Sequence, residues 1–375
     1  MTPTYTICTR CVIDTSDKAI SFDANGVCNH CHNYDRQIAA LPKGIKAKKY
    51  LDSLVRRLKK EGKGKKYDCI IGLSGGVDST YVAYLVKRIF GLRSLAVHLD
   101  NGWNSEVSVK NIEKVVKILD IDLYTHVIDW EEFKDIQLSF LKASTPDSEI
   151  PTDHAIFSVL RQVSKKYKIK TVMNGINLRT EGHHPLSWSQ GHVDFKYIRS
   201  IQNQFGTKKI KTLPHGNFFT VFEDSFSSNW INILNYVDYN KEEAMKIISR
   251  EVGWQDVGGK HFESIYTRFY QGYILPKKFG IDKRRMHFSS LICAGEMTRD
   301  KALVLLKDEP YDVKMQREDV DYVIKKFGIS MEEFEAIMAL PPKSYYDYPS
   351  YYGFLKNSLI QSVIKMLKPL LIKRM

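Results

Sequence analysis

The 375-residue sequence predicts an α/β fold with a parallel sheet, preceded by a small cysteine-bearing unit and followed by a mostly helical region. Three observations support this prediction. Apolar segments of strand length alternate with segments of helical periodicity between residues 67 and 174, as in parallel sheets covered by helices. Two C-x-x-C pairs lie before this part. Helical periodicity dominates beyond about residue 220.

The composition is that of a folded protein, with 43% hydrophobic and 26% charged residues. No run approaches the roughly 18 apolar residues of a membrane span, and the amino-terminal residues lack the pattern of a signal peptide. We therefore expect a cytoplasmic protein that is not integral to a membrane.

Four of the six cysteines form the pattern C-x2-C-x16-C-x2-C, at Cys8, Cys11, Cys28 and Cys31. This spacing is typical of a four-thiolate zinc site, and in a reducing compartment such pairs hold metal more often than they form disulfides. Four protein ligands leave no open position, so we expect a structural Zn²⁺ that helps residues 1–40 to fold as a zinc ribbon. Unligated thiols or a redox pair are the alternative.

A strongly basic segment follows, with eleven Lys or Arg residues and only two acidic ones, Asp52 and Glu61, between positions 43 and 66. Apolar residues recur at helical spacing between positions 50 and 58, which predicts a connector helix within residues 41–66. Such charge is typical of a surface for nucleic acid or an acidic partner, or of a solvated helix face. No aromatic platform is interleaved with it, so we favour the solvated face and expect no nucleic-acid partner.

The sheet should lie in a domain of residues 67–220. Strands are expected at 68–73, 95–99, 123–128 and 171–174, and helices after residue 80, across 109–119, after residue 130 and across 154–167. Ligands of such sheets bind beyond the carboxyl ends of the strands, so the loops after Leu73, Leu99 and Met173 should meet around one crevice.

The last domain, residues 221–375, should be mainly helical. Helices are expected at 238–252, 298–307, 316–327 and 330–338. An amphipathic stretch at 354–375 should dock on the core or on a partner, with a membrane surface as the alternative.

The segment S-G-G-V-D-S at positions 74–79 lies between the first strand and an amphipathic helix. Backbone N–H groups and the helix amino terminus can converge there on an anion, because the two glycines permit close approach. The serine hydroxyls add donors, and Asp78 offers a carboxylate to Mg²⁺. The lysine of a Walker A loop is absent, which argues against ordinary γ-phosphate transfer. A simple strand-to-helix turn capped by the aspartate is the alternative.

S-G-G-x-D-S after a first strand resembles the signature of PP-loop ATP pyrophosphatases. These proteins have an adenine nucleotide alpha hydrolase-like fold, cleave ATP between its α- and β-phosphates and leave an adenylated substrate. The resemblance implies ATP and Mg²⁺ as cofactors and a phosphate site of Ser74, Gly75, Gly76, Asp78 and Ser79, of which Asp78 and Ser79 would be catalytic. The ends of two further strands resemble the segments that hold adenine and close the nucleotide crevice. The residues implied there are Val97, His98, Asp100, Asn174 and Gly175.

A closer resemblance extends over nearly the whole chain and is carried by segments 8–14, 74–79, 150–154, 283–292 and 295–299. With these segments the chain resembles the N-acetyl sugar amidotransferases of surface-polysaccharide (lipopolysaccharide, O-antigen) biosynthesis. The resemblance implies an acidic acetamido sugar, nucleotide-linked or free, that is converted to an acetamidino sugar. ATP would adenylate the amide oxygen, which is otherwise a poor leaving group, and ammonia would replace AMP at the same carbon.

Several charged residues are candidates for the sugar site. A basic cluster can bind a sugar carboxylate or a diphosphate in bidentate fashion, although solvated charges at a helix start are the alternative. Isolated polar residues can position ammonia or accept its proton, although most such residues have ordinary roles. The candidates are Lys283, Arg284 and Arg285 in the cluster, and Asp153, His154, Arg179, Glu181 and Glu296 elsewhere.

The ammonia should come from another protein. A glutaminase of the amino-terminal nucleophile type needs a cysteine directly after the initiator methionine, and Thr2 stands there. Cys69 lies inside the first strand and is expected to be a small buried hydrophobe. The resemblance implies a separate glutaminase and a synthase-like barrel subunit as partners.

Two other functions fit parts of the sequence. PP-loop tRNA thiolation enzymes also adenylate a base oxygen, and a pI near 9.2 suits RNA. They usually need a catalytic cysteine, for which only Cys293 remains outside the zinc pattern and the first strand. A zinc-bearing nucleotide sensor or RNA-binding protein is the non-enzymatic alternative, which substrate-dependent release of pyrophosphate would exclude.

Overall fold

The computed structural model describes residues 5–216 and 229–355. The fold is built on a five-stranded, all-parallel sheet in the order β3-β2-β1-β4-β5. Its strands are β1 (Cys69–Gly72), β2 (Ser94–Asp100), β3 (Asp122–Val127), β4 (Thr171–Asn174) and β5 (Asn229–Asn232). The α/β class and the parallel sheet expected from the sequence are confirmed.

The strand β5 corrects the expectation that strands end before residue 220. It pairs in parallel with β4, from Thr171 opposite Asn229 to Asn174 opposite Asn232. Of its residues, Asn-Trp-Ile-Asn, Ile231 alone is buried, because the strand lies at the edge of the sheet. A strand with so little apolar alternation gives no clear signal in the sequence. The sheet therefore reaches into the region that was expected to be helical.

Helices follow the strands much as expected. The helix α3 (Val77–Tyr84) and the short η1 (Leu85–Ile89) follow β1, α4 (Glu106–Leu119) follows β2, and α5 (Trp130–Ala143) and α6 (Ile150–Tyr167) follow β3. Beyond β4 come α7 (Leu178–Glu181), η2 (Leu186–Trp188) and α8 (Phe195–Phe205).

The carboxy-terminal region is mostly helical, as predicted. After β5 it begins with η3 (Ile233–Tyr236) and α10 (Lys241–Val252). The elements that follow are α11 (Ile265–Phe269), η4 (Tyr270–Phe279), α12 (Arg284–Cys293), α13 (Arg299–Leu305), α14 (Val313–Phe327), α15 (Met331–Ala339), η5 (Tyr345–Asp347) and α16 (Tyr352–Leu355).

Both faces of the sheet are covered. Successive side chains of a strand point to opposite faces, so Ile70 and Ile71 of β1 enter different clusters. Ile71 packs in a cluster with residues of α3, α4 and α10, whereas Ile70 packs with residues of α6 such as Val159 and Val163. This is the arrangement expected of a parallel sheet, whose strands are buried on both sides.

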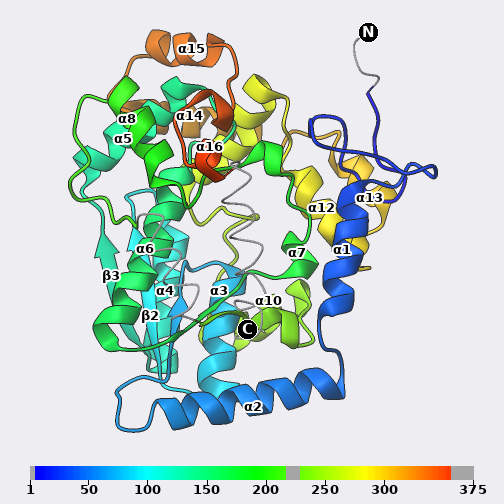
Figure 1. Cartoon of the computed structure of the whole chain (residues 1–375), viewed down its shortest axis with the longest axis vertical. Helices are drawn as coiled ribbons and strands as arrows, with labels where there is room; N and C mark the ends of the chain where they lie inside the picture. Colours follow the sequence, from blue (N-terminus) through cyan, green and yellow to red (C-terminus); the bar gives the residue numbers. More distant parts are fainter. Residues whose placement is uncertain (1–4, 217–228, 356–375) are drawn as a thin grey trace.

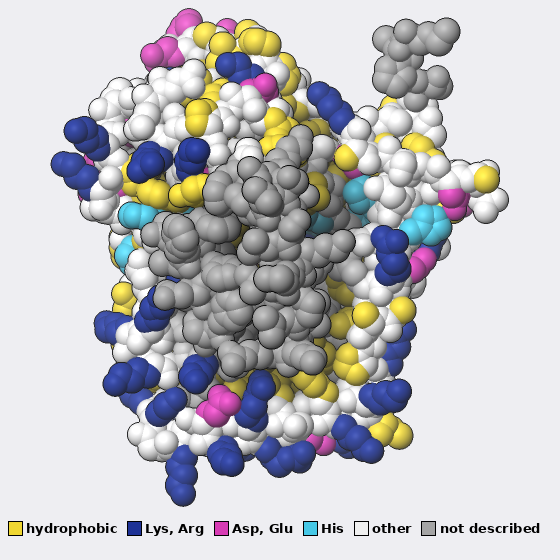
Figure 2. Space-filling view, viewed as in Figure 1, with side chains coloured by type: hydrophobic (Ala, Val, Ile, Leu, Met, Phe, Trp, Pro, Cys, Tyr) yellow, Lys and Arg dark blue, Asp and Glu magenta, His cyan; other side chains and the backbone are white. Residues whose placement is uncertain are grey.

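The basic connector forms α2 (Ile45–Glu61), as predicted. Leu54 and Leu58 are buried in the same hydrophobic cluster as residues of α3, while the lysines and arginines of the connector are exposed. Figure 2 shows dark-blue side chains along the edge of the molecule that α2 occupies at the bottom of Figure 1. The helix therefore presents a solvated basic face.

The cysteine-bearing unit packs against the helical region. Its helix α1 (Asn29–Ala40) lies beside α12 and α13 in Figure 1. Arg299 donates a hydrogen bond to the carbonyl oxygen of Cys8 at 2.9 Å, and the Ser289 hydroxyl accepts one from the Val12 N–H at 3.1 Å. These contacts tie the amino-terminal unit to residues nearly 300 positions later in the chain.

In the described part of the chain, no helix combines the length and the apolar character needed to cross a membrane. The amphipathic stretch expected at 354–375 lies outside the described residues apart from its first two positions.

Residues 74–79, called the glycine loop below, comprise the end of the turn after β1 and the first three residues of α3, and α4 packs against them. Gly75 has a φ of +83°, and a Cβ atom there would lie 2.4 Å from the carbonyl oxygen of Ser108. The Gly75 carbonyl oxygen accepts hydrogen bonds from the Asn111 amide at 3.1 Å and the Trp254 indole at 2.9 Å. Glycine is required here by the left-handed backbone and by the close contact together.

Replacing Gly75 by alanine should destabilise the protein more than the same change at Gly64. Both glycines have positive φ, so both variants carry the cost of left-handed alanine, about 1 kcal/mol. A Cβ at Gly64 meets nothing within 4 Å, whereas at Gly75 it meets backbone that cannot rotate away. We expect Gly75→Ala to lose about 2 kcal/mol more in urea unfolding than Gly64→Ala. Equal losses would contradict the packing described here.

Candidate active site

The glycine loop presents hydroxyl and backbone donors at the start of a helix. Gly76 is the N-cap of α3, so the loop leads into the unpaired N–H groups of a helix amino terminus. The Ser79 hydroxyl lies 3.1 Å from that of Ser74 and accepts a hydrogen bond from the Ser74 N–H at 3.2 Å. Donors that gather at a helix amino terminus in this way form an anion-binding site.

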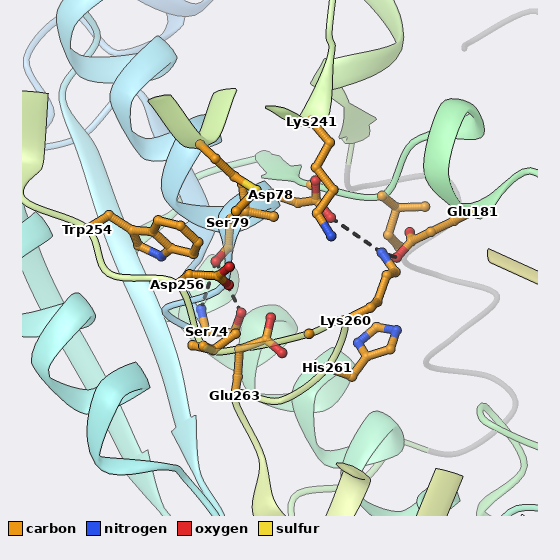
Figure 3. Close-up of a pocket in the computed structure, with 16 residues that line it drawn as sticks. Ser74, Asp78, Ser79, Glu181, Lys241, Trp254, Asp256, Lys260, His261 and Glu263 are labelled. Carbon is orange, nitrogen blue, oxygen red and sulfur yellow. Dashed lines mark hydrogen bonds and ion pairs between the residues drawn. The ribbon is translucent and has the colours of Figure 1, made fainter. Parts of the chain in front are cut away.

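A lysine joins two carboxylates beside the loop (Figure 3). Lys260 Nζ lies 2.7 Å from Glu181 and 3.5 Å from Asp78. Desolvation lowers the pKa of Lys260, but the charges of Glu181 and Asp78 have the larger effect, so the pKa is raised overall. Asp78 also accepts a hydrogen bond from the Tyr239 hydroxyl. The cavity beside the loop, about 190 Å³ in volume, therefore contains an ammonium group as well as the loop donors.

The carboxyl end of β4 reaches the glycine loop, as expected. A Cβ atom on Gly175 would lie 2.9 Å from the Asp78 Cβ and 3.2 Å from the Ser79 nitrogen, so the approach depends on glycine. Asn174 uses its side-chain oxygen to accept the Ile176 N–H at 3.0 Å. The structure thus places Gly175 against the loop, while Asn174 shapes the turn after β4.

The end of β2 lies beside the end of β1. The imidazole of His98 has Nδ1 at 3.0 Å from the Leu73 carbonyl oxygen and Nε2 at 3.2 Å from the Asn104 amide, which fits a neutral ring. Burial lowers the pKa of His98 in agreement. Val97 and His98 line the larger cavity described next. Asp100 accepts a hydrogen bond from Asn104 at 3.1 Å and so helps to close its own turn.

A larger cavity, about 710 Å³ in volume, lies beside the glycine loop and is also lined by charged side chains. Its lining includes Ser74 and Ser79 of the glycine loop. It also includes three of the candidates for the sugar site, Asp153, Glu181 and Lys283. Asp153 lies 2.9 Å from Nδ1 of His192; desolvation opposes protonation of that ring, but the contact with Asp153 raises the pKa of His192 overall. The volume is within the range of small-molecule sites.

Glu149 is a titratable group of this cavity with a strongly shifted pKa. Its carboxylate accepts hydrogen bonds from the Thr267 hydroxyl and, at 3.4 Å, from the Gln271 amide. Desolvation and, after it, the charge of Asp147 raise the pKa of Glu149 to about 8. Sequence reasoning missed Glu149 and Lys260, because neither belongs to a motif with recognisable spacing.

Two arginines of the expected clamp have partners within the chain. Arg284 donates to Asp282 at 2.7 Å and to a backbone carbonyl oxygen after α13. Arg285 lies 2.9 Å from Asp14 of the cysteine-bearing unit. Both guanidinium groups fasten parts of the fold together. Lys283 is the member of the cluster that lines the larger cavity.

Three other candidates also have partners in the protein. His154 is buried, its Nδ1 lies 2.9 Å from the His192 carbonyl oxygen, and burial lowers its pKa to about 4. Arg179 lies 3.6 Å from Glu296 and lines a different cavity, together with Cys293. Desolvation raises the pKa of Glu296.

The four cysteines of the expected zinc pattern come together. All are fully buried, and the sulfur–sulfur distances are 3.9 Å for Cys8–Cys31 and 3.7 Å for Cys11–Cys28 and Cys28–Cys31. Tetrahedral zinc with Zn–S bonds of about 2.3 Å requires separations of about 3.8 Å. The Cys28 N–H donates to the Cys8 sulfur at 3.2 Å, a contact that favours thiolate. The four thiols fit a zinc ion, which would help this small unit to fold.

Two family models match the chain. The NAD synthase model matches residues 47–176, which include the glycine loop and β1 to β4. The model "LPS biosynthesis protein WbpG-like, C-terminal domain" matches residues 263–362.

Two curated proteins are similar in sequence. The uncharacterised protein MJ1599 of Methanocaldococcus jannaschii is 32% identical over 303 residues, which cover 79% of this chain and 91% of that protein. The glutamine-hydrolysing GMP synthase of Pyrobaculum aerophilum is 32% identical over 91 residues, which cover 24% of this chain and 18% of that protein.

Two solved structures are distantly similar. They are an NMN synthetase from Francisella tularensis, with a TM-score of 0.31, and an NH3-dependent NAD synthetase from Campylobacter jejuni, with a TM-score of 0.30. Each is 15% identical, and each match covers 80% of this chain and 99% of the other. Scores this low carry no inference about the site.

The parallel sheet, the glycine loop and the NAD synthase match define the chain as a PP-loop protein, a class of ATP-using enzymes that also use Mg²⁺. The identity to MJ1599 extends over most of both chains, and the WbpG-like match covers the helical region. The chain belongs to the same family as that archaeal protein, and its carboxy-terminal domain is WbpG-like.

Replacing Glu149 by glutamine should change how stability depends on pH. With a native pKa of about 8 and an unfolded pKa of about 4.3, the native state holds a proton between these values that the unfolded state lacks, so wild-type stability falls as pH rises through this window. Glutamine does not titrate. The free energy of unfolding of Glu149→Gln relative to wild type should therefore rise by about 3 kcal/mol between pH 5.5 and 8.5.

Urea unfolding at the two pH values measures this difference. Glu335→Gln, at an exposed position of α15, is the control and should follow wild type at both. A difference between Glu149→Gln and wild type that stays constant across the range would contradict the raised pKa.

Proposed function

We propose that the chain is an ATP-dependent amidotransferase that forms AMP and pyrophosphate. It adenylates the acetamido oxygen of an N-acetylated, acidic, nucleotide-linked sugar, and ammonia then replaces AMP to give an acetamidino sugar for bacterial surface polysaccharide. The match to WbpG-like LPS biosynthesis proteins supports this setting. The observation that carries the proposal is the 710 Å³ cavity, which has the loop serines at one side and Glu149, Asp153 and Lys283 in the same lining.

In this proposal ATP binds with its phosphates on the glycine loop. Ser74, Ser79 and the backbone N–H groups at the start of α3 donate to the phosphate oxygens. Lys241 lines the same cavity and offsets charge on the leaving pyrophosphate, whereas Lys260 is paired with Glu181 and Asp78. Asp78 would hold Mg²⁺, which supplies electrostatic stabilisation of the phosphate oxygens when bound.

The acetamido group lies in the larger cavity, next to the loop. Its oxygen attacks the α-phosphorus, the bond from that phosphorus to the bridging oxygen breaks, and pyrophosphate leaves. Ammonia adds to the activated carbon and loses a proton, and the C–O bond to AMP then breaks. Glu149, with its pKa near the working pH, is suited to accept that proton. Lys283 binds the acidic group of the sugar.

We propose that ammonia comes from a separate glutaminase docked with a synthase-like barrel subunit. Cys69 is fully buried in β1, and Cys293 lines a cavity with Tyr34 and Arg179 rather than either cavity beside the loop. Neither thiol is therefore placed as a glutaminase nucleophile next to the adenylate. The same positions favour amidotransfer over tRNA thiolation, which needs a cysteine close to the adenylated atom.

We assign each part of the chain its own role in the proposed reaction. The zinc ribbon (1–40) and the connector (41–66) support the PP-loop domain (67–220), which binds ATP and whose sheet continues to β5, and the helical region (221–375) supplies the sugar side through Lys283. The enzyme acts in the cytoplasm, where ATP and sugar nucleotides are available.

Turnover products test the proposed reaction. With ATP, Mg²⁺, ammonium and a panel of acetamido sugars, the protein should release AMP and pyrophosphate and form a product in which NH replaces O. Asp78→Asn should lower kcat by about 100-fold or more. Asp120→Asn should leave it unchanged, because Asp120 is an exposed residue at the end of α4. Accumulation of ADP would contradict the proposal.

The nitrogen source tests the proposed partner. The isolated chain should form product with ammonium salts and none with glutamine, because the described cysteines are not placed as a glutaminase. Product formation is measured by mass spectrometry at equal nitrogen concentrations. Equal activity with glutamine alone would show that the chain has its own glutaminase.

A further inference from the structure

A second cluster of metal-binding side chains adjoins the zinc-type site. The Cys31 sulfur lies 3.7 Å from Nε2 of His183 and 3.8 Å from the Cys293 sulfur, and the latter two atoms are 3.8 Å apart. A metal tetrahedron with Zn–S bonds of about 2.3 Å and Zn–N bonds of about 2.0 Å has sulfur–sulfur edges of about 3.8 Å and sulfur–nitrogen edges of about 3.5 Å, so the three observed distances are close to those of a metal site. The three residues come from α1, from the segment after α7 and from the last residue of α12.

The ring of His183 is oriented as a ligand. The Ser290 hydroxyl donates to the Met286 carbonyl oxygen at 3.0 Å, so its oxygen can accept from Nδ1 of His183, which lies 3.4 Å away. That assignment leaves Nε2 without a proton and facing the two sulfur atoms. Metal-binding histidines are typically held in this way, with the other ring nitrogen donating to a neighbour. The Tyr34 ring stacks on His183 at 5.5 Å and limits its rotation.

Electrostatics also favours a second cation. Four buried thiolates around one divalent ion carry a net charge of minus two, and a fifth thiolate at Cys293 would add to it. Unpaired charge in a buried site is costly. A second divalent ion bound by Cys31, His183 and Cys293 reduces the total to minus one, and soft thiolate and imidazole ligands favour zinc.

We propose that the protein binds two zinc ions that share the Cys31 thiolate. The first is held by the four cysteines of the ribbon. The second is held by Cys31, His183 and Cys293, with its fourth position taken by water. The shared thiolate would join α1 to the end of α12, which links the ribbon to the helical region by metal–ligand bonds. This assignment does not depend on the proposed reaction.

Metal content of the full-length protein tests the proposal. The chain is purified reduced, saturated with Zn²⁺ and freed of loose metal by gel filtration, and zinc per chain is measured by inductively coupled plasma mass spectrometry. We expect two zinc ions for wild type and one each for His183→Ala and Cys293→Ser. The controls Cys69→Ala and His126→Ala remove a cysteine or histidine outside both clusters and should keep two.

The wild-type value decides the question even where a variant does not fold. One zinc per wild-type chain would overturn the proposal. Two zinc ions in folded His183→Ala and Cys293→Ser, checked by circular dichroism, would overturn the assigned ligands. Co²⁺ gives an independent reading, since the absorption of the wild-type protein should rise until two equivalents are bound and that of Cys293→Ser until one. A wild-type titration that saturates at one equivalent would also overturn it.

Discussion

The glycine loop can bind an anion only while two rigid neighbours hold it. From behind, α4 contacts Gly75 so closely that a side chain would meet the backbone of Ser108, and Trp254 holds the Gly75 carbonyl. At the front, Gly175 brings the end of β4 against Asp78. Both neighbours adjoin strands of one sheet. The register of that sheet therefore sets the shape of the loop, and the cavities on each side of the loop depend on it.

Charge is the second constraint at this site. Four carboxylates, those of Asp78, Glu181, Asp256 and Glu263, line the cavity beside the loop, and desolvation raises the pKa of Glu263. They would repel a triphosphate unless cations offset them. Lys260 is already paired with two of the carboxylates, which leaves Lys241 and a bound Mg²⁺ as the groups that would balance the ligand. The acidic lining is thus consistent with a metal–nucleotide complex rather than free nucleotide.

The sequence predicted those parts of the fold that have local signals. An apolar strand followed by S-G-G-V-D-S marked the loop, and cysteine spacing marked the ribbon. The short edge strand β5 has one buried residue and gave no such signal. Lys260 is 182 residues from Asp78, so only the folded chain shows that they meet. Residue type alone also cannot separate a substrate clamp from a structural ion pair, and the contact of Arg285 with Asp14 is seen only in the folded chain.

The helix α12 connects the ribbon to the larger cavity. At its start Lys283 and Met286 line that cavity, Arg285 binds Asp14 of the ribbon, and at its end Cys293 contacts Cys31. A helix of ten residues is too short to bend appreciably between these points, so a displaced ribbon would also displace the cavity wall. Metal at the ribbon would therefore influence substrate binding through the position of α12, without any contact between metal and substrate. This explains why a PP-loop enzyme would keep its ribbon packed against the helical region instead of on a flexible tether.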